Sequence, residues 1–186
     1  MKKVLIAFSL MIVCTFAYAL DECAYLAKET PQNKFPEWEP YENCAQYENG
    51  KLIIAPEHKE KIDFGSSGLA PFMTQGQYFY VKKNGSFLPV IFFDNGADYF
   101  QEGLARSLVN GKIAYYNQNF EPVIPPKYDW GWPFADGRAL VCSGCSVQKP
   151  DKNGHKPVVG GVWGYINKKG KEVVPVKYSQ SEVRSK

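Results

Sequence analysis

The chain alternates short apolar runs with turn-forming residues, and long helical periodicity is absent. Residues 78–90 read YFYVKKNGSFLPV, two β-prone runs joined around Asn84-Gly85, a dipeptide that accepts the positive φ angles of a tight hairpin turn. A similar arrangement turns at Lys169-Gly170, and a further hairpin turns at Asn110-Gly111. This pattern predicts an all-β fold made of antiparallel hairpins.

The hairpins recur at a regular spacing along the chain. The tripeptide at residues 68–70 (GLA) returns at residues 103–105 and, with Arg in the middle, at residues 137–139, with steps of 35 and 34 residues. Each unit is expected to contain three short strands: one after the tripeptide, one around a central tyrosine and one before a proline. A unit of this size cannot bury an apolar face alone, so neighbouring units must stack. A phenylalanine precedes each tripeptide: Phe64, Phe100 and Phe134.

The third unit is longer than the others. The central tyrosines are Tyr80, Tyr115 and Tyr165, at steps of 35 and 50 residues, which places an insertion of about 15 residues inside the third unit. Residues 49–59 resemble the second half of a unit whose first half is missing. The sequence therefore predicts about three and a half tandem units over residues 49–186, with the insertion at about 142–160.

Two details of the units have structural consequences. A proline stands near the end of each unit and cannot donate a ladder hydrogen bond, so it should end its strand or lie on a sheet edge; these residues are Pro89, Pro125 and Pro175. The second turn of the second unit contains Asn119-Phe120, where the other two units have glycine. That substitution is a departure from the pattern.

The first 19 residues have the three parts of a signal peptide. Lys2 and Lys3 supply a positive start, residues 4–16 form an apolar run too short to span a bilayer comfortably, and residues 17–19 supply small residues for cleavage. We expect cleavage after residue 19, with no transmembrane segment left afterwards, and a periplasmic or secreted protein.

Residues 20–48 are expected to form a separate N-terminal segment. Residues 20–30 (LDECAYLAKET) predict one short helix, ended by Pro31. Residues 31–43 predict an extended connector that is interrupted by prolines.

Four cysteines remain after the signal peptide, and an even number in an exported chain implies disulfide bonds. Three pairings are possible. We favour Cys23–Cys44 and Cys142–Cys145, because each pair is close in sequence and the two pairs are far apart. The first would close a loop of about 20 residues and stabilise the fold by about 3 kcal/mol, and the second should add less.

The charge balance excludes an electrostatic nucleic-acid binder. Removing residues 1–19 takes away two lysines and no acid, which leaves 20 basic residues against 19 acidic ones and a net charge of +1. No cluster of Lys or Arg is longer than two residues. The chain therefore lacks the basic patch that nucleic acids or anionic membranes require.

Residues 161–178, GVWGYINKKGKEVVPVKY, resemble the WG-repeat family of bacterial proteins. The family unit runs Gly-x-Trp-Gly-Tyr-Ile-Asp/Asn, a Lys-Gly turn, Val-Ile-Pro-x-Lys-Tyr, and then Phe-x-x-Gly-Leu-Ala. The likeness is close over residues 160–178, good over 100–136 and partial over 63–99. The resemblance implies a repeat fold used for binding, often in exported proteins and mostly without known enzymatic activity, and it supplies no catalytic residues.

The Cys-Ser-Gly-Cys motif at residues 142–145 admits two interpretations. A redox motif would need a helix N-terminus to lower the pKa of the first thiol, but this one follows a strand-like run, so a structural disulfide that braces the insertion is favoured. A zinc site from Cys142, Cys145 and His155 lacks a fourth ligand, so no metal is expected. No hydrolase, zinc-protease or phosphate-loop motif is present, and we expect neither a cofactor nor an enzyme.

The aromatic residues mostly recur in phase, which indicates packing between units. The exception is YDWGWPF at residues 128–134, where Trp130 and Trp132 flank a glycine at a unit junction beside Asp129. Two such rings and a neighbouring acid are typical of a recognition surface. The favoured interpretation is a non-enzymatic module that binds a protein partner through these residues and the insertion. The alternatives are an envelope thiol-disulfide protein or a carbohydrate or peptidoglycan binder.

Overall fold

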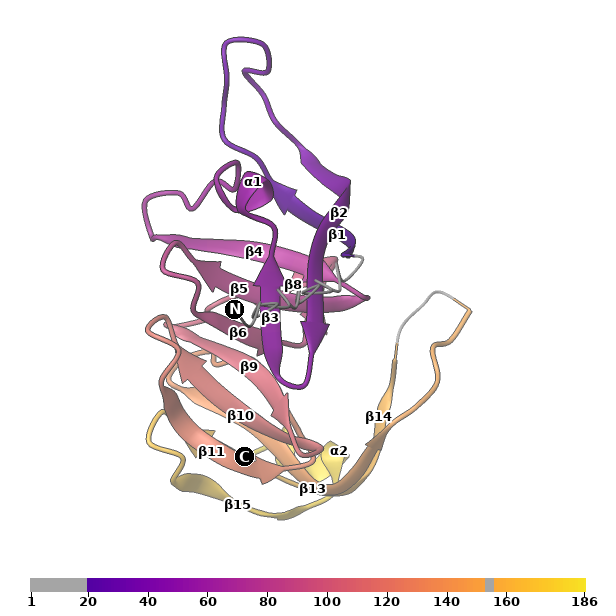
Figure 1. The fold of residues 1–186 in the computed structure, drawn as a ribbon. Helices are drawn as coiled ribbons and strands as arrows, with labels where there is room; N and C mark the ends of the chain where they lie inside the picture. Colours follow the sequence, from indigo (N-terminus) through magenta and orange to yellow (C-terminus); the bar gives the residue numbers. More distant parts are fainter. Residues whose placement is uncertain (1–19, 153–155) are drawn as a thin grey trace, which may run out of the picture.

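The computed structural model describes residues 20–152 and 156–186, so the predicted signal peptide lies outside the described residues. The described chain is mostly strand, with two helices of four residues, α1 (Pro56–Lys59) and α2 (Gln180–Val183). Its sheets stack along a long axis (Figure 1). The strands are β1 (Asp21–Leu26), β2 (Trp38–Glu48), β3 (Lys51–Ile54), β4 (Leu69–Thr74), β5 (Gln77–Lys82), β6 (Phe87–Val90), β7 (Phe92–Phe93), β8 (Gly96–Ala97), β9 (Leu104–Val109), β10 (Lys112–Asn117), β11 (Pro122–Tyr128), β12 (Trp130–Gly131), β13 (Arg138–Val147), β14 (Val158–Asn167) and β15 (Glu172–Tyr178).

The predicted units are present as three-stranded antiparallel meanders. They are β4–β5–β6, β9–β10–β11 and β13–β14–β15, and each begins just after one of the three recurring phenylalanines. The all-β fold of tandem hairpins and the count of three strands per unit are therefore confirmed.

The second turn of each meander has one backbone conformation in all three units. The residue in its fourth position has a positive φ: 91° at Gly85, 69° at Phe120 and 73° at Gly170. In the second unit the Asn117 N–H donates to the Glu121 carbonyl at 3.0 Å, as the equivalent residues do in the other two. The departure at Phe120 is therefore one of sequence and not of geometry, and a bulky side chain occupies a conformation that favours glycine.

The three strands that contain the recurring prolines, β6, β11 and β15, are all edge strands of their sheets. Pro89 illustrates why this is tolerated. The Lys82 N–H donates to the Ser86 carbonyl at 2.9 Å, which places the Pro89–Phe79 pair in a non-hydrogen-bonded position of the ladder. The missing N–H would have pointed away from the neighbouring strand, so the expectation from the sequence is confirmed.

The helix predicted over residues 20–30 is wrong. Residues 21–26 form β1, which pairs with β2 on one side and with β4 on the other. The run Cys23–Tyr25 is fully buried because both neighbours of this strand are paired and its two faces are covered. A short continuous apolar run of this kind fits a central strand as well as a helix, and the pairing partners decide between them.

The missing first half of the incomplete unit at residues 49–59 is supplied by the N-terminal segment, residues 20–48, which contains β1 and β2. β2 and β3 form a hairpin through Asn49-Gly50, whose φ angles of 52° and 73° are those of a type I′ turn. Strands β1, β2 and β3 are thus a fourth meander, joined edge to edge with β4–β6 in one six-stranded sheet of order β3-β2-β1-β4-β5-β6. The extended connector predicted over residues 31–43 ends in β2, which begins at Trp38.

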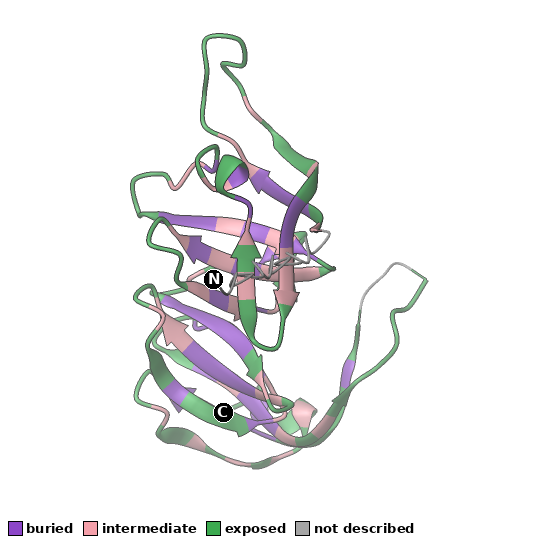
Figure 2. Ribbon diagram, viewed as in Figure 1, coloured by how far each residue is buried: buried purple, intermediate pink, exposed green. Residues whose placement is uncertain are grey.

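Four apolar clusters run through the stack, and Figure 2 shows the buried residues following the centres of the sheets. The first cluster fills the six-stranded sheet around the Cys23–Cys44 disulfide, whose Cα atoms are 5.5 Å apart. The second and third join neighbouring meanders. The fourth surrounds Cys142 and Trp163 and includes Val183 of α2, a short helix that begins with a capping box at Ser179.

Candidate functional site

The predicted insertion forms a long hairpin arm. β13 and β14 pair continuously from Arg138–Asn167 at the sheet to Val147–Val158 at the far end, and the arm projects from the stack (Figure 1). Its described outer residues, 146–152, 156–157 and 159–162, are all exposed. Val147 and Val159 are 44% and 43% exposed, although both lie in strands.

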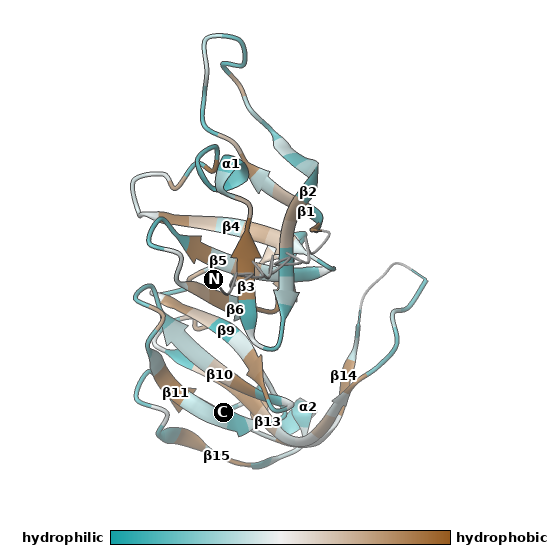
Figure 3. Cartoon of the chain, in the orientation of Figure 1, coloured by the Kyte–Doolittle hydropathy of each residue, from teal (hydrophilic) through white to brown (hydrophobic). Residues whose placement is uncertain are grey.

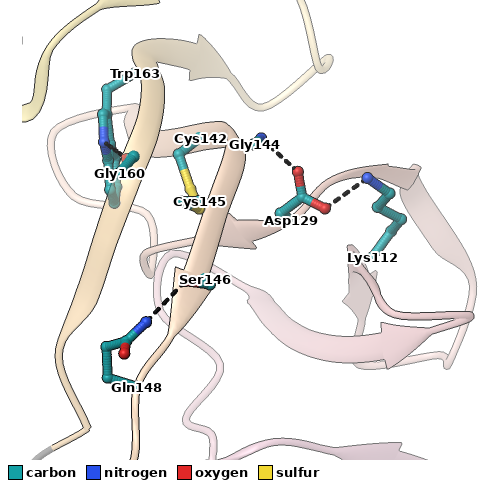
Figure 4. Close-up of a disulfide and its surroundings, with 9 residues drawn as sticks. All are labelled: Lys112, Asp129, Cys142, Gly144, Cys145, Ser146, Gln148, Gly160 and Trp163. Carbon is teal, nitrogen blue, oxygen red and sulfur yellow. Dashed lines mark hydrogen bonds and ion pairs between the residues drawn. A yellow bond between two sulfur atoms is a disulfide. The ribbon is translucent and has the colours of Figure 1, made fainter.

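A disulfide and two glycines form the base of this arm. Cys142 and Cys145 are bonded across Gly144, which has a φ of 75° (Figure 4). Cys142 is completely buried, whereas Cys145 is half-buried. Gly161 lies opposite with a φ of 68°, and a Cβ there would stand 2.5 Å from the Ser143 carbonyl oxygen. The pair of left-handed glycines bends the hairpin, and the disulfide fixes the bend.

Asp129, in the connector before β12, holds the backbone at Gly144. Its Oδ2 accepts the Gly144 N–H at 2.6 Å, and its Oδ1 is 2.6 Å from the Lys112 ammonium (Figure 4). The hydrogen bond and charge of Lys112, with the Gly144 N–H, lower the pKa of Asp129 below its ordinary value. Asp129, the acid predicted from the sequence for the partner-binding surface, therefore positions the arm.

Trp130 and Trp132 lie beside the same disulfide. Trp130 in β12 pairs with Cys142, and the Trp132 N–H donates to the Leu140 carbonyl at 2.8 Å. The two rings meet edge to face at 6.1 Å, and both side chains are partly buried against the fourth apolar cluster. The Trp130 Nε1 atom is buried without a hydrogen-bond partner among the described residues. The structure thus brings Asp129, both tryptophans and the arm together at one end of the stack.

Sequence reasoning missed a buried ion pair at the junction of the second and third meanders. The Arg106 guanidinium and the Asp98 carboxylate are 0% and 1% exposed, and two guanidinium nitrogens bond the two carboxylate oxygens. Arg106 also donates to the Gly131 carbonyl at 2.8 Å and stacks 4.3 Å from the Phe93 ring. The pair therefore connects three successive parts of the chain.

Tyr115 packs at the same junction. Its hydroxyl donates to the Trp132 carbonyl at 2.8 Å, and burial raises its pKa well above the ordinary value. A Cβ at Gly131 would lie 2.3 Å from this hydroxyl oxygen, so the glycine between the two tryptophans is required for the close approach. A signal for this junction was present in the sequence: Arg106 is an ionic residue inside an apolar strand, but nothing in the repeat pattern points to Asp98.

The cysteines are not available for metal binding, because both pairs form disulfides as predicted. His155, the third residue of the zinc alternative, lies outside the described residues. Over residues 20–152 and 156–186, no group of three potential metal ligands comes together, and no helix is long and apolar enough to cross a membrane.

The Trp-Gly dipeptide at residues 163–164 belongs to the core. The Trp163 ring is 0% exposed, and its Nε1–H donates to the Gly160 carbonyl at 2.9 Å. A Cβ at Gly164 would lie 2.5 Å from the Val174 carbonyl oxygen, so only glycine allows β15 to pair this closely. The signature residues are therefore structural.

Comparison with known proteins supports the same view. The sequence model of the WG containing repeat family matches residues 114–144 and 163–181. Neither the curated proteins nor the solved structures contain a significant match to the chain. The matched residues run from β10 through the connector to the base of the arm, and from β14 to the beginning of α2. These segments are WG containing repeats, and the resemblance predicted from the sequence is confirmed.

Proposed function

We propose that the protein is an exported, non-enzymatic module that binds a protein partner through the arm and the aromatic connector at its base. The single observation that carries this proposal is the arm itself. Apart from Val158, which is 8% exposed, its described outer residues are exposed, including valines in paired strands, so they add little to the core. A hairpin that contributes little to folding but is fixed at its base by a disulfide is suited to presenting a contact surface.

The fixed base is the second part of the argument. A flexible hairpin would lose conformational entropy when a partner binds, whereas a preorganised one loses less. The Cys142–Cys145 bond and the hydrogen bond from the Gly144 N–H to the Asp129 carboxylate both restrain the angle at which the arm leaves the sheet. The arm is thus preorganised for contact.

The composition of the arm favours a particular kind of partner. Residues 145–160 contain three lysines and one aspartate, together with exposed valines. Trp132 and Trp130 offer further apolar surface at the base, where their rings are only partly buried. A protein surface with acidic and apolar side chains would complement these groups.

The redox and carbohydrate alternatives have weaker support. Cys142 is completely buried and lies within strand β13, whereas the reactive thiol of a redox motif usually stands at a helix N-terminus. The two tryptophan rings are half-buried and edge to face, so they do not offer a flat exposed platform for a sugar. The two disulfides are typical of an oxidising compartment, which supports the periplasm or the cell exterior.

The test is an affinity capture from an envelope extract with an arm-trimmed variant. The Gln148 N–H donates to the Pro157 carbonyl at 2.8 Å, which makes these two residues a hydrogen-bonded pair. Replacing residues 149–157 with Asn-Gly-Thr therefore closes the hairpin with the turn that joins β9 to β10. We expect the wild type to capture a specific protein and the trimmed variant to capture at least tenfold less.

Two further variants sharpen this test. Trp130→Ala/Trp132→Ala should also reduce capture, whereas Lys34→Ala/Phe35→Ala, in the exposed loop between β1 and β2 at the other end of the stack, should not. Equal capture by the wild type and the trimmed variant would exclude the arm as the contact. A fluorescence change with millimolar glycan fragments would instead support the carbohydrate alternative.

A further inference from the structure

We propose that the free edge of β3 and the groove beside it form a second binding site, which takes up an extended acidic segment of a partner protein as an added strand. This site lies in the N-terminal sheet, in the half of the molecule away from the arm (Figure 1). It does not depend on the function proposed for the arm, and it is tested separately.

The hydrogen bonds between β2 and β3 show which backbone groups of β3 are free. The Ala55 N–H donates to the Cys44 carbonyl at 2.8 Å, and Ala45 stands opposite Ile54. In an antiparallel ladder this puts Ile54 and, two residues earlier, Leu52 in non-hydrogen-bonded pairs. The N–H and C=O groups of Leu52 and Ile54 therefore point away from β2. In the described part of the chain, β3 has no second strand neighbour.

A groove of about 240 Å³ lies beside this edge. Its apolar lining comes from β3, from Phe64 and from Val81 at the end of β5. Ile53, on the outer face of β3, is 56% exposed. Figure 3 shows β3 as a hydrophobic strand, and Figure 2 shows the same strand as exposed and half-buried. An exposed apolar edge is normally covered or protected by charge, so this one is suited to pairing with another strand.

The charges around the groove define the ligand. Lys59 and Lys82 line it, and no acidic residue does. The Lys82 Nζ atom lies 4.4 Å from the centroid of the Phe120 ring. Neither Lys59 nor Lys82 forms a salt bridge within the part of the chain that the structure describes. A strand paired with Leu52 and Ile54 would run within reach of both ammonium groups, so Asp or Glu side chains on it would be favoured.

An acidic peptide strand fits this site better than a second copy of the protein. In a symmetric dimer the same patch is used twice, so two β3 edges would meet and bring the lysines of both copies together. The like charges would oppose that dimer. A helix would not satisfy the outward N–H and C=O groups of Leu52 and Ile54, whereas an extended segment would.

The test is a selection of random twelve-residue peptides displayed on phage against the purified protein with both disulfides formed. We expect the enriched peptides to combine β-branched residues with Asp or Glu. A synthetic copy of an enriched peptide should slow hydrogen exchange at the amides of Leu52 and Ile54 at least tenfold. The amide of Ile53, which already pairs with β2, should change little.

Variants distinguish strand addition from loose charge attraction. Leu52→Pro removes one outward N–H without removing a bond to β2, and Lys59→Glu/Lys82→Glu reverses the charge; each should weaken peptide binding at least tenfold. Lys149→Glu/Lys152→Glu, in the arm, is the matched control and should leave the affinity unchanged. Failure to enrich any peptide, or enriched peptides that bind Leu52→Pro as well as they bind the wild type, would overturn the proposal. Either result leaves the arm-capture experiment unaffected.

Discussion

The two halves of the molecule hold the same kind of meander together in different ways. In the N-terminal half, two meanders share one six-stranded sheet, because β1 pairs directly with β4. In the C-terminal half, β9–β11 and β12–β15 are separate sheets that meet through side chains. There the hydrogen bond from Arg106, which is paired with Asp98, to the Gly131 carbonyl and the Glu102–Lys168 salt bridge connect one meander to the next.

This difference explains where the family pattern survives. Residues 114–144 and 163–181 match the WG containing repeat, and both lie in the half that depends on side-chain packing between sheets. In that half the fully buried Trp163 and the constrained Gly164 leave little room for substitution. Backbone pairing between β1 and β4 joins the N-terminal meanders, and the Cys23–Cys44 disulfide braces the first of them. These bonds do not require particular repeat residues.

The largest expected effect is on the ion pair at the junction of the C-terminal half. Asp98→Ala would leave the Arg106 guanidinium buried without its counter-charge, which should lower the free energy of unfolding by about 3–5 kcal/mol. Chemical denaturation with urea measures this. The double variant Asp98→Leu/Arg106→Met should recover most of the loss. A single variant within 1 kcal/mol of wild type would show that the pair does not hold the junction.

The next effect concerns the N-terminal half. Replacing Cys23 and Cys44 with serine removes a link that closes a loop of about 20 residues, so the free energy of unfolding should fall by about 3 kcal/mol. Hydrogen exchange should accelerate first in β1 and β2, while β13–β15 stays protected. Acceleration that is uniform across both halves would contradict the separation drawn between them.

Replacing Cys142 and Cys145 with serine should have a smaller effect, because this disulfide closes a much shorter loop. The chain-entropy estimate is about 2 kcal/mol. The change should appear as faster exchange at the base of the arm, around Gly144, with the N-terminal sheet unaffected. Faster exchange in β1–β3 would show that the arm is coupled to the distant half.

The left-handed Phe120 gives an effect of about 1 kcal/mol. Phe120→Gly and Phe120→Ala both remove the ring, but only alanine retains a Cβ at a φ of 69°. The glycine variant should therefore be the more stable of the two. At Leu108, exposed in β9, the order should reverse, because glycine weakens an ordinary strand. The same order at both positions would show that the turn relaxes to accept a side chain.

The smallest effect is the pH dependence that Asp129 supplies. Its pKa is lowered in the folded state, so the unfolded chain takes up the proton first as the pH falls. The stabilisation is complete above the ordinary aspartate pKa of about 4 and is lost as the pH drops through the lowered value. Because Lys112 is exposed, the contribution should stay under about 1 kcal/mol. The stability difference between wild type and Asp129→Asn should shrink below about pH 4, and a constant difference would contradict this.

Much of the fold could be read from the sequence because the units repeat. The turns at Asn84-Gly85 and Asn110-Gly111, the edge prolines and the insertion inside the third unit all follow from local residue preferences and regular spacing. The cysteine pairs followed from their separation. These features depend on neighbours close in the chain, which is why a pattern could reveal them.

The remaining features depend on contacts that no pattern shows. The run at Cys23–Tyr25 became a strand because β2 and β4 lie on either side of it, and the sequence alone does not specify those neighbours. The Asp98–Arg106 pair does not recur in the other units, because the positions equivalent to Arg106 are Pro71 and Leu140. The role of Asp129 in holding the backbone at Gly144 likewise depends on a three-dimensional contact across 15 residues.

The most direct test of the account is the free energy of unfolding of the variant in which Asn-Gly-Thr replaces residues 149–157. The arm is described here as a contact surface held at its base, so its outer part should add almost nothing to the stability of the stack. Urea denaturation should give a value within about 0.5 kcal/mol of wild type, as expected for changes away from the core. A loss of more than 2 kcal/mol would show that the arm belongs to the folding core, and the separation between the stacked meanders and their contact surface would fail.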